Sequence, residues 1–376
     1  MGQAYTPGLK VSRSEEILKE RILPLKGKIN VKKGDMVDSE TVVASTELPG
    51  NVELVNIVNK LNITPDEVNE CLKVKPNETI KKGQKLAENN GIFGFFKSSC
   101  LSPIDGIVES VSEITGQMVL RHPPIPIEVK AYVNGIIDEI LPEQGVIIKL
   151  NAAFIQGIFG IGGETVGELA VVSKNISDEL TEDLIVEEHK GKIIVGGSYI
   201  NSKALHKAIK VGVKGIIVGG IDAQDLKEFL GYDIGVAITG SEDVGITLIT
   251  TEGFGKINMA QKTFDLLSSY SGEKTSINGA TQIRAGVIRP EIIIPLNEED
   301  IKKTGSNESE NVQGLAPGQL IRIIREPDFG QVVKIKSLPV ELHKVESETK
   351  VRVVEVEYPD GKTRLVPRAN IEIIEL

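Results

Sequence analysis

The sequence predicts a multidomain protein with a β-rich N-terminal part, a central α/β domain and a small β-barrel at the C-terminus. The chain has 376 residues, which is enough for two or three domains. Aromatic residues make up only 4% and Trp is absent, so Ile, Val, Leu and Ala must build the core. Such a composition favours sheets. Strands alternate with short helices in the central region, whereas the flanking regions consist mainly of short strands and turns.

The N-terminal domain is predicted to span residues 1–150. Its strands show a period of two and are separated by Gly-containing turns. One helix is expected in "NITPDEVNECLKV", where Thr64 can cap the N-terminus and Pro65 fits the first turn. Asp66 and Glu67 favour the positive end of the same helix.

Two similar stretches in this domain, "VKKGDMVDSETVVAS" and "IKKGQKLAE", are followed by "LSPIDGIVESVSEITGQMV". This pattern resembles the barrel-sandwich hybrid fold of biotinyl and lipoyl carrier domains over roughly residues 25–150. The resemblance implies two half-domains that fold over each other at turns containing Gly83 and Gly106. The hairpin that presents a modifiable lysine in carriers is replaced here by "ENNGIFGFFKSSC". We therefore expect an unmodified docking or spacer module, without covalent biotin or lipoate and without another cofactor.

That replacement segment is itself a candidate partner-binding element. Phe93, Phe95 and Phe96 place three of the nine phenylalanines within four positions. An exposed apolar protrusion of this kind suits a protein partner or a membrane surface. Packing against a neighbouring domain is the alternative.

The central domain, residues 151–296, is predicted to be an open α/β sheet with parallel strands. Helices are expected in "NSKALHKAIKVG" and "DAQDLKEFLG", each after a buried-type strand. Ligands of open α/β sheets bind beyond the carboxyl ends of the strands, where helix N-termini favour anions. The candidates for binding a phosphorylated small molecule are Gly196, Gly197, Ser198, Asn201, Gly219, Gly220, Asp222, Thr251 and Glu252. Tight turns and helix caps are the alternative role for the same residues.

The sequence offers no evident catalytic or metal-binding constellation. No nucleophile-elbow or zinc-protease motif occurs, and the four His and two Cys do not form a metal-ligand pattern. We therefore predict no catalytic residues and no metal site, and an enzyme is the less favoured reading.

A charged linker rich in Ser and Asn, residues 297–315, precedes a C-terminal block of short strands, residues 316–376. The segment "APGQLIRIIREPDFGQVVKI" resembles the KOW motif of the elongation factor NusG and several ribosomal proteins, and the later strands extend the likeness to an SH3-like barrel. The resemblance implies binding to RNA, the ribosome, RNA polymerase or another protein complex. The candidate contacts are Arg322, Arg325, Phe329, Arg364 and Arg368.

The net charge of −10 disfavours a broad nucleic-acid surface, and no DNA-binding signature is present. No signal peptide or membrane span is evident, and two free thiols fit a reducing compartment, so we expect a cytoplasmic protein. The favoured function is a non-catalytic adaptor that docks to a macromolecular assembly through the C-terminal barrel. The alternatives are an enzyme or sensor for a phosphorylated small molecule, and a membrane- or envelope-associated transport adaptor.

Overall fold

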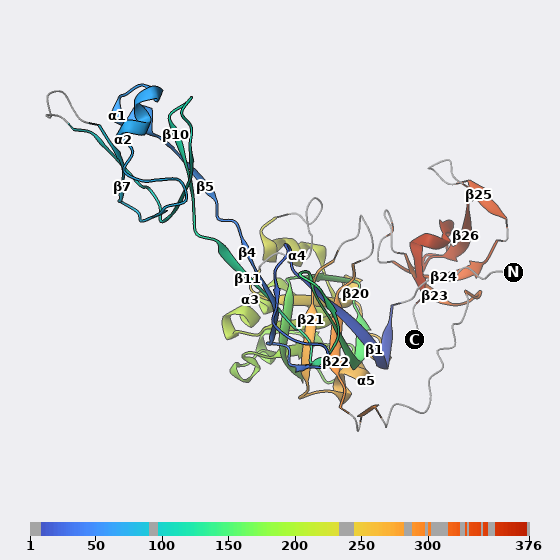
Figure 1. The fold of residues 1–376 in the computed structure, drawn as a ribbon. Coiled ribbons are helices and arrows are strands. Elements are labelled where there is room, and N and C mark those ends of the chain that lie inside the picture. The colour runs from blue at the N-terminus through green and yellow to red at the C-terminus, as the bar shows by residue number, and fades with distance from the viewer. Residues whose placement is uncertain are drawn as a thin grey trace.

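The computed structural model confirms a β-rich chain built from several sheets (Figure 1). It describes residues 9–89, 97–232, 244–281, 288–297, 300–301, 315–323, 328, 331–339, 341–344 and 350–373. The predicted contact residues Phe93, Phe95, Phe96, Arg325 and Phe329 lie outside these ranges.

Residues 9–48 and 125–297 are here called the body, and the N-terminal strands form one part of it. Alternating residues of the strand Gly145–Gln156, including Val146 and Ile148, pack into a core with Val43, Ala131 and Val133. The strands concerned are β1 (Val11–Ile22), β2 (Lys28–Ile29), β3 (Met36–Val37), β4 (Val42–Leu48), β11 (Ile125–Lys130), β12 (Gly135–Leu141) and β13 (Gly145–Gln156).

Residues 49–124, here called the arm, form a separately packed unit inserted between β4 and β11. Its core includes Leu61, Leu86, Met118 and Leu120, which belong to a hydrophobic cluster distinct from that of the body. Figure 1 shows the arm projecting from the body, with β4 and β11 running between the two. The elements of the arm are β5 (Val52–Asn56), α1 (Ile57–Leu61), α2 (Val68–Cys71), β6 (Thr79–Ile80), β7 (Lys85–Glu88), β8 (Ser99–Leu101), β9 (Gly106–Val111) and β10 (Gln117–Arg121).

The central sheet is mixed rather than wholly parallel. Its parallel part runs in the order β20-β19-β17-β15, and β21, β22 and β13 continue the sheet in antiparallel fashion. Because β13 is one continuous strand, the domain boundary predicted at residue 150 falls inside a strand shared by both parts. The remaining strands are β14 (Phe159–Ile161), β15 (Glu164–Val171), β16 (Glu179–Leu180), β17 (Ile193–Val195), β18 (Tyr199–Ile200), β19 (Gly215–Ile221), β20 (Thr247–Phe254), β21 (Lys274–Asn278) and β22 (Glu291–Pro295).

Helices cover both faces of the parallel part. Ile216 and Val218 of β19 share a core with α3 (Ser202–Val211) and α4 (Ala223–Leu230). Ile217, which points to the opposite face, shares a core with α5 (Gln261–Ser269). This alternation is what a strand buried on both faces requires. The parallel part of the sheet therefore lies between two layers of helices.

The C-terminal module, residues 315–373, is an antiparallel sheet with its own core, in which Ile321, Ile335, Val354 and Val356 are buried. Asp360 and Gly361 form a hairpin turn, because β26 pairs with β27 across them and Gly361 has a φ of +81°. Its strands are β23 (Leu320–Ile323), β24 (Val332–Ser337), β25 (Leu342–Lys344), β26 (Lys350–Glu357), β27 (Thr363–Pro367) and β28 (Ile371–Ile373).

The separate cores predict that the arm can be removed without unfolding the body. Leu48 and Ile125 are cross-strand partners, so an Asn-Gly turn can replace residues 49–124. We expect the melting temperature of the body to change by less than about 4 °C, the shift that about 1 kcal/mol produces in a domain of this size. Differential scanning calorimetry measures it. Met118→Ala in the full chain should instead lower only the transition of the arm, and loss of the body's cooperative transition after excision would refute the prediction.

Candidate functional site

The structure brings the predicted ligand-binding residues together at the carboxyl edge of the parallel strands. The amide of Gly220 donates to the carbonyl of Ser198 at 2.8 Å, and Gly220 is aligned with Gly253 of the next strand. Glu252 precedes that glycine, so segments far apart in sequence converge at one edge of the sheet. This is the convergence expected from the topology of an open α/β sheet.

The glycines at this edge are enclosed by backbone. A Cβ atom on Gly219 would lie 2.1 Å from the carbonyl oxygen of Ile257, and one on Gly220 would lie 2.2 Å from that of Gly255. Gly197 is likewise enclosed by the backbone of Asn175 and Asp178, whereas a Cβ atom on Gly196 would meet the side chains of Val218 and Leu180. Here the Gly-Gly pairs therefore allow loops to pack directly against the strand ends.

The polar residues of this edge make structural hydrogen bonds. Asn201 caps α3 by accepting from the amide of Ala204, and Asp222 caps α4 by accepting from Gln224, both at 2.8 Å. The hydroxyls of Ser198 and Thr251 are buried and donate to the carbonyls of Ser177 and Val218, respectively. Binding of a phosphorylated ligand at this edge stays a prediction.

Glu252 and Arg322 form a buried ion pair that joins the C-terminal module to the central sheet. Arg322 Nη2 lies 2.5 Å from Glu252 Oε2, and the side chains are 1% and 8% exposed. The other carboxylate oxygen, Oε1, accepts from the amide of Ala260 at 3.1 Å. A residue predicted to bind a ligand and a residue predicted to bind a partner thus contact each other within the chain.

The other two described arginines of the predicted partner-binding set differ in their surroundings. Arg364 is 59% exposed and donates to the carboxylate of Asp328 at 2.7 Å. The same carboxylate accepts from the hydroxyl of Tyr358. Arg368 instead donates to the carbonyls of Val353 and Pro339 inside the module. Of the two, Arg364 is the one available at the surface.

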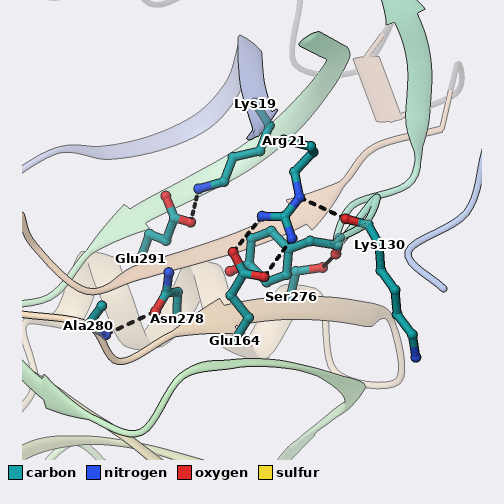
Figure 2. Close-up of polar contacts among 9 residues, drawn as sticks. Lys19, Arg21, Lys130, Glu164, Ser276, Asn278, Ala280 and Glu291 are labelled. Carbon is teal, nitrogen blue, oxygen red and sulfur yellow. Dashed lines mark hydrogen bonds and ion pairs between the residues drawn. The ribbon is translucent and has the colours of Figure 1, made fainter. Parts of the chain in front are cut away.

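A second polar cluster, which the sequence did not reveal, lies where β1 meets the central sheet (Figure 2). Arg21 donates to both carboxylate oxygens of Glu164, at 2.6 and 2.8 Å, and its Nε donates to the carbonyl of Lys130 at 2.7 Å. Lys19 of the same strand is ion-paired with Glu291. The cluster thus ties β1 to β15 and β22 through charge-assisted hydrogen bonds.

Tyr132 lies beneath these charges in a left-handed backbone conformation with a φ of +69°. The cationic groups of Lys19 and Arg21 lie 5.2 and 5.3 Å from the centre of its ring. Its carbonyl accepts from the hydroxyl of Ser276 at 2.6 Å, whereas its own hydroxyl is buried and meets no described residue with the geometry of a hydrogen bond. Burial, reinforced by the carboxylates of Glu291 and Glu164, raises the pKa of Tyr132 well above 10.0.

An open hollow of about 540 Å³ adjoins this cluster. Three of its lining residues are carboxylates, and two are cations that are already paired: Arg21 with Glu164 and Lys130 with Glu40. Its lining residues are Glu20, Arg21, Ile22, Glu128, Val129, Lys130 and Glu164. The hollow is therefore acidic, which favours a cationic occupant.

The sequence signal for this cluster was present but ambiguous. Lys19 and Arg21 alternate with Leu18, Glu20 and Ile22, which indicates a strand. Because charged residues occur at both the odd and the even positions, the sequence does not show which side of the strand faces the core. In the structure these two side chains are partly buried, and their cationic groups lie over the ring of Tyr132.

No protein-family model matches the sequence, and no curated protein shows significant similarity to it. Within the described residues, no three His, Cys, Asp or Glu side chains are grouped so that they could hold a metal ion. None of the described helices is both long and apolar enough to cross a membrane.

The ion pair predicts strong coupling between the C-terminal module and the body. Arg322→Met leaves the buried carboxylate of Glu252 without its arginine, so it should lower the free energy of unfolding by about 3 to 5 kcal/mol. Urea denaturation measures this loss. Arg364→Met, which breaks an exposed pair, serves as the control and should cost less than about 1 kcal/mol. Equal losses for the buried and the exposed pair would contradict a role for burial.

Tyr132 predicts a specific dependence of stability on pH. Its folded pKa lies above the unfolded value of 10.0, so its contribution is fully present below that value and is lost as the pH rises above it. Tyr132→Phe keeps the ring but removes the ionisable hydroxyl. In urea unfolding at about pH 8 the variant should be at least as stable as the wild type, and at about pH 11 it should be more stable.

Tyr232→Phe is the matched control for this measurement, because Tyr232 is 46% exposed. It should leave the alkaline loss of stability unchanged. A Tyr132→Phe variant that loses stability at alkaline pH as steeply as the wild type would disprove the assignment.

Proposed function

We propose that the protein is a non-catalytic adaptor that docks to a macromolecular assembly, such as RNA polymerase, the ribosome or another protein complex, through its C-terminal module. The observation that carries the proposal is the separation of the chain into a central body and two attached modules with their own cores. A body that presents two independent modules suits a protein that connects partners.

The C-terminal module contacts the body through Arg322 and has exposed side chains elsewhere. Arg322 of β23 is buried against Glu252, which fixes the orientation of the module. Leu342 and Leu365 are 55% and 49% exposed, and Arg364 is 59% exposed. The C-terminal module thus carries exposed apolar side chains and an exposed arginine on its strands, and arginine is enriched in protein-binding surfaces. We propose that these residues belong to an SH3-like barrel of the KOW type and contact the assembly.

The arm supports the same proposal. It is attached through the paired strands β4 and β11 and carries exposed apolar residues, including Leu54 at 60% and Ile114 at 88%. An enzyme is less favoured because the polar side chains at the carboxyl edge of the sheet make internal hydrogen bonds or ion pairs.

Gradient sedimentation of the tagged full-length chain from its native cells tests the proposal. The wild type should sediment with a large assembly, and the triple variant Leu342→Asp, Arg364→Glu and Leu365→Asp should reduce that fraction about tenfold, the effect of losing about 1.4 kcal/mol of binding free energy. Leu184→Asp, at an exposed site on the body, is the control and should sediment like the wild type. Sedimentation of the wild type as a free chain would overturn the proposal.

A further inference from the structure

The strands β3, β12, β13 and β1 place four side chains in one lateral row on the outside of the body. The register pairs Met36 with Ile136, Ile136 with Lys149, and Lys149 with Leu18. Residues paired in this way lie on the same face of an antiparallel sheet. Met36 is 85% exposed, Leu18 is 56% exposed and Ile136 is 48% exposed. Large apolar side chains therefore stand together in solvent.

The next two rows extend this surface, which we call the outer β-face. Glu139 and Glu20 flank Ile147, and Ile22, which is 44% exposed, follows at the end of β1. The outer β-face comprises Glu16, Leu18, Glu20, Ile22, Met36, Ile136, Glu139, Leu141, Ile147 and Lys149.

The outer β-face continues a surface that is covered elsewhere in the molecule. Ala153 and Ile155 lie on the same side of β13 as Ile147 and Lys149, and they pack in one core with Phe264 of α5. The first half of this side of β13 lacks such a cover, since Leu18 and Ile136 beside it are exposed. A contiguous exposed apolar patch of this kind marks an interaction site.

The charges of the outer β-face select among possible occupants. Lys149 is paired with Glu16 at 2.6 Å, whereas Glu20 and Glu139 form no ion pair with a described residue. Three carboxylates against one ammonium leave two uncompensated negative charges around the apolar row. Nucleic acids and anionic lipid surfaces are therefore repelled, and two copies of this face would bring like charges together.

The acidic hollow adjoins the same surface. Glu20 and Ile22 belong to both, and Glu128 adds another carboxylate that has no ion-pair partner among the described residues. A long cationic side chain lying across Ile22 can place its charged end in this hollow, as lysine and arginine do when their stems cover apolar surface.

We propose that the outer β-face and the acidic hollow together bind a basic, amphipathic peptide segment of a partner protein. Its apolar side chains pack on Leu18, Met36 and Ile136, and a lysine or arginine enters the hollow beside Glu20 and Glu128. The proposal deepens the adaptor function and rests on it, by giving the body a partner site of its own.

Fluorescence anisotropy of a labelled synthetic amphipathic peptide of Leu and Lys, titrated with the full-length chain, tests the proposal. The Leu/Lys peptide should bind, and the matched Leu/Glu peptide should not. The double variant Glu20→Lys and Glu139→Lys should weaken binding about tenfold or more, and so should Leu18→Asp combined with Met36→Asp. Circular dichroism melting confirms that these surface variants remain folded.

Two control variants separate this site from general attraction to an acidic protein. Glu228→Lys, on the exposed side of α4, and Ile114→Asp, on the arm, should bind the Leu/Lys peptide as the wild type does. Equal weakening by control and test variants would overturn the proposal. So would a dimer in analytical ultracentrifugation that Leu18→Asp abolishes, because a second copy would then cover the outer β-face.

The peptide and sedimentation experiments fail independently. If the chain sediments with an assembly but does not bind the Leu/Lys peptide, the proposed site on the body is refuted and the adaptor function is retained. If the chain binds the peptide but sediments alone, the adaptor function is refuted.

Discussion

The hydrogen-bonded ladder of β13 is the constraint on which the body of this protein depends. This strand pairs with β1 along its whole length, with β12 in its first half and with β22 in its second half. One face contributes Val146 and Ile148 to the N-terminal core, and the other contributes Ala153 and Ile155 to the core under α5. A shift of one residue would exchange the two faces and expose both sets, so the register of β13 fixes the N-terminal strands relative to the α/β sheet.

The second constraint is the burial of charge between modules. Glu252 lies near the end of β20, a strand whose residues are almost all buried, and its partner Arg322 lies on β23 of the C-terminal module, which has its own core. Apolar contacts alone allow many orientations of the C-terminal module relative to the body. A buried carboxylate permits only those orientations in which a cation pairs with it. The carboxyl edge of the sheet, where α/β proteins commonly bind ligands, is used here in part to seat the C-terminal module.

The sequence predicted the elements that local chemistry determines. The two helices expected in the central region span residues 202–211 and 223–230. They begin after Asn201 and Asp222, which take the alternative role of helix caps, and end at Gly212 and Gly231, which have positive φ. Pairing between distant segments was not predictable, because strand periodicity does not name a partner strand. For this reason the continuity of β13, the antiparallel half of the sheet, and the meeting of Arg322 with Glu252 required the structure.

The same limit explains why the outer β-face was not evident from the sequence. Leu18, Met36 and Ile136 belong to three segments, and each alone resembles an ordinary half-buried strand position. Only the register shows that they share a row, and only the placement of α5 shows that this row lies beyond the helix that covers the rest of the face. Exposed apolar residues that are scattered need no explanation. Residues that are aligned on one sheet and bordered by carboxylates with no ion-pair partner among the described residues have the composition of a binding surface. Because β13 holds these side chains in fixed positions, a partner segment bound there would need little rearrangement of the body.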